Sequence, residues 1–487
     1  MTLIAEGKSI KKGTEIELDV ESLAFGAKGV TRINDLVCFV EGAIPGQKVL
    51  ARITRKKKKY CEAKIIDIIQ QSKMYTEPRC RHFYDCGGCS LQHLDYSRQI
   101  KNKETQVQDI LQRIGEFNNF IMLPVLPSAE LYDYRNKMEF SFARERWLTS
   151  EEINSGQQLD RYGLFLGMHA KGFYEKVVDL QECHLVKPVV IDILKTVRTL
   201  AKESGLPVFS TKDHSGFWRF LVVRFCKNTE DLMVNVVTRN YNDNLAEKMK
   251  NVLTAKFPQI TSLLLSTTTS KASVAFSEKE YLLYGQKTVY EKLGKYNFEI
   301  SGNSFFQPNT KQAERLYNIV LDFAEFKGNE NVYDLYCGAG TISIYISAFV
   351  KRVVGFESVS SAIADARNNC KLNNIKNCHF LLADLKDELQ DTQKMTEQYG
   401  NPDVMIIDPP RSGMHPKTVK GILNLHPRRI IHVSCNPATL ARDLNLLCNS
   451  DYRLIKVQPV DMFPHTSHVE AVALLKRKNE ENFLSQK

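Results

Sequence analysis

Several features are absent from this sequence, and each absence excludes a class of protein. No stretch reaches the roughly 18–20 consecutive apolar residues that a membrane-spanning helix needs. Residues 1–12 lack the apolar core of a signal peptide. The chain also has no internal repeat and no long low-complexity segment. We therefore expect a cytoplasmic protein without a membrane partner.

The composition is that of a globular protein. Of the 487 residues, 43% are hydrophobic and 25% are charged, and 66 Lys and Arg exceed 56 Asp and Glu to give a formal net charge of +10. At roughly 100–200 residues per domain, this length predicts two to four domains and excludes disordered chains, collagens and small disulfide scaffolds. The twelve cysteines would lie in a reducing compartment, so regular spacing among them indicates metal binding or catalysis.

Short β-branched runs broken by glycine fill the first domain, which we place at residues 1–72. The runs at 15–20, 36–40, 48–53 and 63–69 predict a small all-β barrel. Between residues 48 and 59 stand seven Lys and Arg and no acid, and we expect nothing in the barrel to offset this charge. Such a run is either a solvated loop or a surface that follows a phosphate backbone.

The rest of the chain divides into two further predicted domains. Residues 73–300 mix strand-like and helical segments and predict an α+β domain, in which a helix at 95–115 could pack on the C-terminal domain. In residues 301–480, strands alternate regularly with helices, at 331–335, 352–356, 378–382, 404–407, 429–433 and 453–460. This alternation predicts a doubly wound, Rossmann-like α/β sheet.

Three successive strand ends of the C-terminal domain carry groups that suit an adenosine ligand. The first strand runs into the sequence DLYCGAGT (residues 334–341), whose glycines let the backbone approach a ligand at a helix N-terminus. Glu357 ends the next strand, where it can bind ribose hydroxyls, and Asp384 follows the third. No Gly-x-x-x-x-Gly-Lys-Ser/Thr loop for a triphosphate exists, so S-adenosyl-L-methionine is the leading cofactor.

The later strand ends carry a cysteine and two carboxylates. Asp408 begins a rigid Asp-Pro-Pro-Arg loop, Cys435 follows the fifth strand, and Glu470 enters the last one. The residue after the prolines is Arg411, not an aromatic residue, which argues against methylation of an exocyclic amine. Beside a methyl donor, Cys435 could add to carbon 6 of uracil to activate carbon 5, and Glu470 could then remove the carbon 5 proton.

His465 and His468 precede that last strand and could tune either step, although a lone histidine is more often a structural hydrogen-bonding group. A stacked uridine cannot reach the cysteine, so we expect the base to be flipped out. Phe305 or Phe306 is our candidate for holding it.

A second candidate site consists of four cysteines, Cys80, Cys86, Cys89 and Cys183. Glycines between the thiolates free backbone N–H groups to face sulfur. Four thiolates suit either tetrahedral zinc or an iron–sulfur cube, so the residues alone leave both open. Because the spacing differs from the Cys-x-x-x-Cys-x-x-Cys of radical enzymes, we expect a structural or RNA-positioning site.

In these residues and motifs the chain resembles the RNA (uracil-5-)-methyltransferases, and more closely their branch acting on 23S ribosomal RNA. The motifs GNSFFQPN (302–309), DLYCGAGT (334–341), DPPR (408–411), SCNP (434–437) and HVE (468–470) fall in that family's order. The resemblance implies that the first domain is an OB-like TRAM domain that binds RNA, and that the four cysteines hold a [4Fe–4S] cluster.

The same resemblance implies roles for individual residues. Cys435 would be the nucleophile and Glu470 the base. The residues implied to contact S-adenosylmethionine are Gln307, Tyr336, Thr341, Glu357, Asp384 and Asp408.

The sequence leaves rival functions open. The nearest alternative is an enzyme with the same chemistry that acts on the T-loop uridine of transfer RNA. The four cysteines favour ribosomal RNA as the substrate, because the transfer-RNA branch of the family generally lacks them. An enzyme that modifies two ribosomal sites is another alternative. A non-catalytic RNA-binding iron–sulfur protein, with Cys435 as a buried thiol, is a rival from a different class. The sequence does not fix the oligomeric state, and we favour a monomer.

Overall fold

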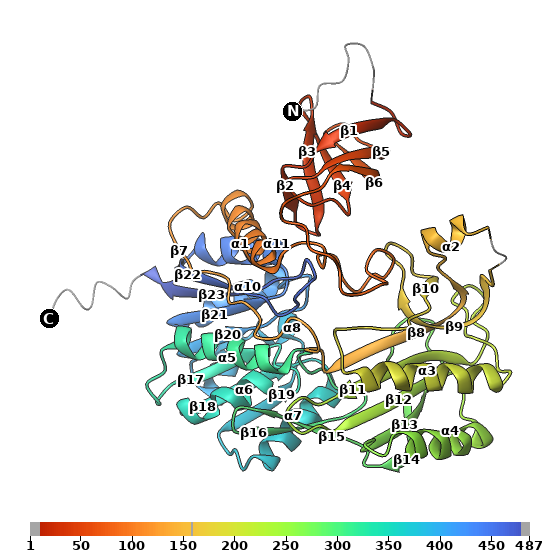
Figure 1. The fold of residues 1–487 in the computed structure, drawn as a ribbon. Coiled ribbons are helices and arrows are strands. Elements are labelled where there is room, and N and C mark those ends of the chain that lie inside the picture. Colours follow the sequence, from red (N-terminus) through yellow and green to blue (C-terminus); the bar gives the residue numbers. More distant parts are fainter. Residues whose placement is uncertain (1–9, 157–158, 479–487) are drawn as a thin grey trace.

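The first unit of the fold is a small β-structure at the N-terminal end (Figure 1). The computed structural model describes residues 10–156 and 159–478. This unit is a six-stranded sheet in the order β1-β5-β6-β4-β3-β2, and its inward side chains, such as Leu18, Val40 and Ile53, form a separate apolar core. The strands are β1 (Glu15–Asp19), β2 (Ser22–Ala24), β3 (Lys28–Ile33), β4 (Leu36–Glu41), β5 (Lys48–Lys56) and β6 (Tyr60–Gln70).

The basic run lies on the β5–β6 hairpin. Residues 55–59 are exposed around its tip. Lower on β5, Lys48 and Arg52 pair with Glu17 and Glu15 of β1, at 2.9 and 2.7 Å. The expectation that nothing in the barrel offsets the positive charge is therefore wrong for these two residues, because the antiparallel β1–β5 register brings the acids of β1 beside them. The exposed positive charge is concentrated at the tip.

The second unit is a seven-stranded sheet with helices on one face. Its order is β10-β9-β8-β11-β12-β13-β14, and α4 makes the crossover between the parallel strands β12 and β13. Apolar side chains of the strands pack with α3 and α4 in one core. The elements are α2 (Ser150–Asn154), α3 (Pro188–Glu203), α4 (Asp243–Lys256), β8 (Lys137–Arg146), β9 (Tyr162–His169), β10 (Lys176–Val178), β11 (Trp218–Phe225), β12 (Leu232–Thr238), β13 (Ser262–Thr267) and β14 (Lys279–Gly285).

The third unit is an eight-stranded sheet in the order β19-β18-β17-β20-β21-β23-β22-β7. β23 runs antiparallel to its two neighbours, whereas β17–β21 are parallel, which confirms the predicted doubly wound sheet. The strands are β7 (Ile121–Met122), β17 (Asn331–Leu335), β18 (Arg352–Glu357), β19 (Cys378–Leu382), β20 (Val404–Ile407), β21 (Arg429–Ser434), β22 (Tyr452–Val460) and β23 (Glu470–Arg477).

Helices cover both faces of this sheet (Figure 1). Side chains of α5, α6 and α7 belong to the core on one face, and those of α1 and α8–α11 belong to the core on the other. These helices are α1 (Tyr96–Arg113), α5 (Thr310–Ala324), α6 (Thr341–Ile346), α7 (Ser360–Leu372), α8 (Leu385–Glu388), α9 (Thr392–Tyr399), α10 (Pro416–Leu425) and α11 (Pro437–Cys448), with the short 3₁₀ helix η1 (Ser347–Phe349).

Segments that precede the third unit in sequence also pack on it. The helix predicted at 95–115 is α1, and its buried Val107 and Leu111 lie in the core with α11. β7 adds a parallel edge strand beside β22. The hairpin of β15 (Val289–Leu293) and β16 (Tyr296–Ile300) shares its core with α5. The third unit is thus completed by residues from well outside the alternating region.

Candidate active site

The turn after β17 forms one side of the site. Tyr336, Gly338 and Gly340 all have left-handed backbone, with φ of 65°, 53° and 77°. A Cβ at Gly340 would lie 2.8 Å from the ring of Phe380, so this position has no room for a side chain. Tyr336 carries a side chain in a conformation that costs energy, and such strain is concentrated at functional sites. Helix α6 begins directly after this turn, so the backbone N–H groups of its first residues lie beside the turn.

Glu357 closes the turn from the end of β18. Its Oε2 accepts a hydrogen bond from the Gly338 N–H at 3.2 Å, and its Oε1 accepts from the N–H groups of Ser358 and Val359. The carboxylate is therefore fixed by backbone donors beside the glycine turn. This is the place where a ribose would lie in a doubly wound fold.

Gln307, Thr341 and Asp384 lie in different surroundings. The Thr341 hydroxyl is 3.0 Å from the Tyr317 hydroxyl of α5, and the Gln307 carbonyl accepts a hydrogen bond from Asn136. Asp384 is half-exposed, caps α8 and forms an ion pair with Lys386 at 2.8 Å, which lowers the pKa of its carboxyl. Asp384 is thus engaged in a surface ion pair.

A cluster of titratable groups lies where β20, β21 and β23 meet. Burial raises the pKa of Asp408 to about 7, with a further contribution from Asp334. Burial also raises the pKa of Glu470 to about 8, and Asp408 raises it further while Arg411 lowers it. The pKa of Cys435 rises to about 11 through burial and through the carboxylates of Glu470 and Asp408, against the effect of Arg411. Cys435, Glu470, Asp408 and Arg411 are therefore electrostatic neighbours.

Prolines and capping bonds fix the loops of this cluster. Pro437 begins α11, and the Asn436 side chain caps it by accepting from the Ala438 N–H. Asn436 Nδ2 and Thr439 Oγ1 both donate to the Arg411 carbonyl, at 3.2 and 3.3 Å. The loop that carries Cys435 is thus tied to the loop that carries Asp408 and Arg411.

Two members of the site were missed in the sequence. Asp334 is fully buried at the end of β17, accepts a hydrogen bond from Ser343 at 2.5 Å, and has its pKa raised to about 7 by burial. Burial raises the pKa of the Tyr317 hydroxyl of α5, and Asp408, Asp334 and Glu470 raise it further. Asp334 opens the DLYCGAGT motif and could have been found there, whereas no local pattern singles out Tyr317.

The candidate aromatic and histidine residues differ in exposure. Phe305 is 70% exposed, but Phe306 is 3% exposed and packs against Phe298. The prediction for Phe306 is wrong, because a ring inside the core cannot stack on a base, while that for Phe305 stays a prediction. Burial lowers the pKa of both His465 and His468 to about 4, so both are neutral at pH 7.

The four cysteines converge from residues 80–89 and 183. Burial raises the pKa of Cys86, and the other three thiols raise it further. The Gly88 N–H, which donates to the Cys86 sulfur at 3.4 Å, lowers it. The buried ammonium group of Lys171 interacts with Cys86 and Cys89. Even so, within residues 10–156 and 159–478 no three His, Cys, Asp or Glu side chains are close enough together to hold a metal ion. The donors fit a thiolate-bound metal in chemistry, but they do not form a closed ligand set.

Two family descriptions match this chain. The TRAM domain matches residues 10–66, which form the N-terminal sheet, and "tRNA (Uracil-5-)-methyltransferase" matches residues 217–478, which carry the clustered cysteine and carboxylates. The chain belongs to the tRNA (uracil-5-)-methyltransferase family. The family resemblance inferred from the sequence motifs is thereby confirmed, whereas its 23S ribosomal RNA branch stays a prediction.

Individual relatives match this chain over nearly its full length. The chain is 41% identical over 470 residues to a protein of Chlorobaculum tepidum described as an uncharacterized RNA methyltransferase, covering 96% of this chain and 97% of the relative. It is 42% identical over 476 residues to one from Porphyromonas gingivalis, covering 95% and 100%. The crystal structure of the Pyrococcus abyssi tRNA (uracil-54, C5)-methyltransferase with S-adenosyl-L-homocysteine is 29% identical, with a TM-score of 0.72 over 94% of this chain and 99% of that one.

The protein is therefore an RNA methyltransferase with an N-terminal TRAM domain. The rival interpretation as a non-catalytic RNA-binding protein is set aside. Among the helices of the described ranges, none has the length and apolar character to span a membrane.

Proposed function

We propose that this methyltransferase transfers the methyl group of S-adenosylmethionine to carbon 5 of a uridine in 23S ribosomal RNA. The observation that carries the proposal is the cluster of Cys435, Glu470, Asp408 and Arg411 at one end of the C-terminal sheet. Ligands of doubly wound folds bind at the carboxyl ends of the parallel strands, and this is the edge at which the cluster lies.

The first step uses Cys435 as a nucleophile. Its thiol gives its proton to Asp408, and the Arg411 guanidinium next to it favours the thiolate. The sulfur bonds to carbon 6 of uracil, and the carbon 5–carbon 6 electrons move toward the carbonyl oxygen to give an enolate. Carbon 5 then attacks the methyl group on the positively charged sulfur of S-adenosylmethionine, the sulfur–methyl bond breaks, and S-adenosylhomocysteine leaves with its electron pair.

The second step releases the product. The methylated carbon 5 still carries its proton, which Glu470 removes. The double bond between carbon 5 and carbon 6 then re-forms, and Cys435 leaves carbon 6 as a thiolate with the electron pair of the broken bond. The thiolate takes back the proton that Asp408 holds. Asp408 takes the thiol proton at the start so that Glu470 remains available as a base. Because burial raises the pKa of Glu470 to about 8, its basic form increases as the pH rises through that value.

We further propose that Gln307, Tyr336, Thr341, Glu357, Asp384 and Asp408 contact S-adenosylmethionine. The left-handed turn at Tyr336 and the backbone-held carboxylate of Glu357 support this proposal. The solved relative from Pyrococcus abyssi, which holds S-adenosyl-L-homocysteine, supports it as well. To contact the ligand, Asp384 would have to leave its ion pair with Lys386.

The cysteines Cys80, Cys86, Cys89 and Cys183 would hold a [4Fe–4S] cluster. Within the described residues no three of these thiols are close enough together to bind a metal, so the cysteines would have to move closer to hold the cluster. The proposal is supported by the proximity of the other three thiols to Cys86, the Gly88 N–H that faces sulfur and the nearby ammonium group of Lys171. Protein purified without oxygen should be brown and contain iron. Colourless protein with zinc would contradict the proposal. Replacing Cys86 by Ala should remove the colour, whereas Cys226→Ala, a buried thiol outside the set, should keep it.

A transfer-RNA uridine is the second candidate substrate. It is favoured by the matching family description and by the Pyrococcus abyssi enzyme, which acts on transfer RNA. Mass spectrometry of ribosomal and transfer RNA from cells with and without the gene separates the two. Loss of 5-methyluridine from 23S ribosomal RNA is the expected result, and its position would identify one site or two. Loss from transfer RNA alone would move the proposal to the second substrate.

A further inference from the structure

The segment 461–469 leads directly into Glu470 and is mostly buried, apart from the exposed His468 and the partly buried Phe463 and Ser467. It joins β22 to β23, and Asp461, His465 and Val469 are all less than 5% exposed. His465 has a left-handed φ of 64°, which costs a residue other than glycine energy. The backbone in front of Glu470 is therefore held in a conformation that its surroundings must maintain.

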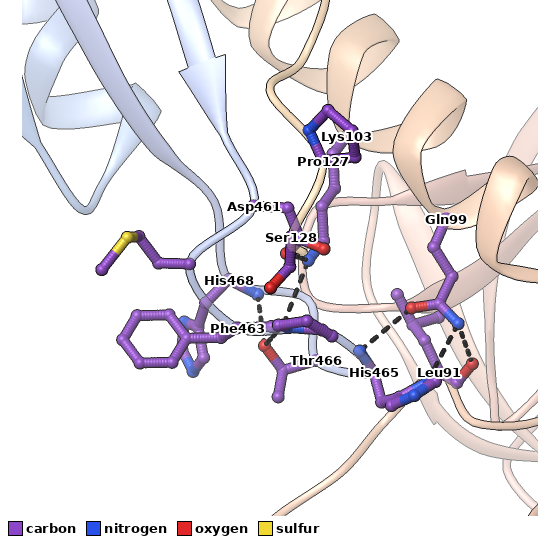
Figure 2. Close-up of polar contacts among 12 residues, drawn as sticks. Leu91, Gln99, Lys103, Pro127, Ser128, Asp461, Phe463, His465, Thr466 and His468 are labelled. Carbon is purple, nitrogen blue, oxygen red and sulfur yellow. Dashed lines mark hydrogen bonds and ion pairs between the residues drawn. The ribbon is translucent and has the colours of Figure 1, made fainter. Parts of the chain in front are cut away.

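Helix α1 holds this segment from one side (Figure 2). Lys103 Nζ donates to Asp461 Oδ1 at 2.6 Å and to the Phe463 carbonyl at 3.2 Å. The Lys103 and Asp461 side chains are 1% and 0% exposed. One turn earlier on the helix, Gln99 accepts a hydrogen bond from the His465 N–H at 3.1 Å. The Tyr96 hydroxyl donates to the other carboxylate oxygen of Asp461 at 2.8 Å.

The cysteine-rich segment holds the same loop from another side. The N–H groups of Ser90 and Leu91, directly after Cys89, both donate to the His465 carbonyl at 2.9 Å. The ring of Tyr132 stacks on His465 with centroids 4.5 Å apart. The loop in front of Glu470 is thus fixed by residues more than 300 positions earlier in the chain.

We propose that Lys103 is a positioning residue that aims Glu470 at the carbon 5 proton of the methylated uracil. A buried ion pair contributes little net stability, but its directional bonds can select one geometry among several. Here the ammonium group joins the Asp461 side chain to the Phe463 backbone and so sets the path of the loop into β23. This inference depends on the proposed role of Glu470 as the base.

The test is a comparison of adduct and turnover in the full-length protein. Lys103→Met leaves Asp461 buried without its cation, so a second variant, Lys103→Met with Asp461→Asn, removes that charge as well. With S-adenosylmethionine and uridine RNA, we expect product release to slow by at least about tenfold, which is part of what a general base contributes. A denaturation-resistant RNA adduct of Cys435 should accumulate. Lys101→Met, on the exposed face of α1, is the control.

The outcomes separate positioning from folding. If the double variant has a wild-type melting curve and wild-type turnover, the proposal is overturned. It is also overturned if adduct formation and turnover fall together, because a merely structural role predicts that result. If the wild-type protein forms no adduct with 5-fluorouridine RNA, the proposed chemistry fails, and not the positioning role alone.

A second feature, independent of the first, is a cavity of about 350 Å³ on the seven-stranded sheet. This volume is at the lower end of the range for small-ligand sites, about 300–1,000 Å³. Strands β8, β9 and β11 and the loop at 209–213 line it. Tyr162 and Tyr174 stand at its border, 71% and 89% exposed. None of the residues proposed for methyl transfer lines this cavity.

The cavity also contains a guanidinium group that lies over an aromatic ring. The Arg219 guanidinium lies 4.1 Å from the centre of the Phe209 ring and donates to the carbonyls of Thr268, Ser270 and Ala272. Other charges of the lining are paired, Arg144 with Asp213 at 3.2 Å and Lys212 with Glu175 at 2.8 Å. A phosphate would find these cations already neutralised, whereas a flat, uncharged base can stack on the aromatic rings.

We infer that this cavity binds an unpaired nucleobase of the RNA, away from the uridine that is methylated. Stacking on aromatic rings contributes about 1–3 kcal/mol per base in single-strand binding, or roughly a 5- to 150-fold change in affinity. The inference depends on RNA as the substrate and not on the roles of Cys435 or Glu470.

The test uses the full-length protein and a fluorescently labelled single-stranded RNA of mixed sequence. Tyr162→Ala with Tyr174→Ala should raise the Kd at least about fivefold and leave kcat at saturating RNA unchanged. Tyr284→Ala, an exposed tyrosine of β14 outside the cavity, is the control and should not change the Kd. A Kd within about twofold of wild type, or a fall in kcat at unchanged Kd, would overturn the inference.

Discussion

The basic hairpin of the TRAM domain and the carboxylate cluster of the C-terminal sheet use charge in opposite ways. Residues 55–59 are exposed at a hairpin tip, so they act through a field that reaches into solvent. Glu470 is buried and Asp408 is partly buried, and burial raises the pKa values of Asp408 and Glu470 to about 7 and 8. The comparison teaches that exposed charge attracts RNA, whereas buried carboxyls become groups that exchange protons near neutral pH.

The largest expected effect comes from removing the nucleophile inside the cluster. Cys435→Ala should lower methylation by on the order of 10⁴-fold or more, because loss of a nucleophile removes the covalent route. It should also abolish the adduct with 5-fluorouridine RNA on a denaturing gel. Cys448→Ala, a half-buried thiol on α11, should retain both. An adduct that persists without Cys435 would contradict the mechanism.

Loss of the base should have the next largest effect. Glu470→Gln should slow product release by about 10²–10⁴-fold while the covalent adduct forms, since only the last proton transfer is lost. In the wild type, the release rate should rise between about pH 7 and 9, because the base must be deprotonated and burial raises the pKa of Glu470 to about 8. A rate that is flat over this range in single-turnover experiments would argue against Glu470.

A smaller effect is expected at the basic hairpin. Changing Lys56, Lys57, Lys58 and Lys59 to Gln should raise the Kd for RNA about tenfold at low salt and make the dependence on salt less steep. The value of kcat at saturating RNA should stay unchanged. Lys48→Gln with Arg52→Gln is the matched control, because these two cations are paired with Glu17 and Glu15. Equal effects of the two sets would remove the distinction between exposed and paired charge.

The smallest expected effect is on stability. In the folded protein the pKa values of Asp408 and Glu470 lie above their ordinary values. The contribution of these two groups to the stability of the fold is therefore greatest below about pH 4. It is lost as the pH rises through 7 and 8. Asp408→Asn with Glu470→Gln should remove most of this pH-dependent loss between pH 5 and 8. Thermal unfolding at the two pH values measures it, and an unchanged difference would contradict the assigned burial.

Much of the third unit could be predicted because its signals are local. The six predicted strands from 331 to 460 are observed within one residue at each end. Four of them, β17, β18, β20 and β21, are buried parallel strands, which form continuous apolar runs in the sequence. The helix predicted at 95–115 is also observed. Phe306 was misassigned because two adjacent phenylalanines look alike in the sequence, and only packing against Phe298 separates the buried ring from the exposed one.

The sequence by itself determined the order of the elements, the glycine turn at 334–341, and the motifs that hold Cys435, Asp408 and Glu470, because each is encoded by neighbouring residues. Only the tertiary structure decided that Tyr317 joins the site, and that Lys103 pairs with Asp461 across 358 positions of sequence. It also decided which carboxyls titrate near neutral pH. Burial and long-range contacts depend on how distant segments pack, and no local pattern records them.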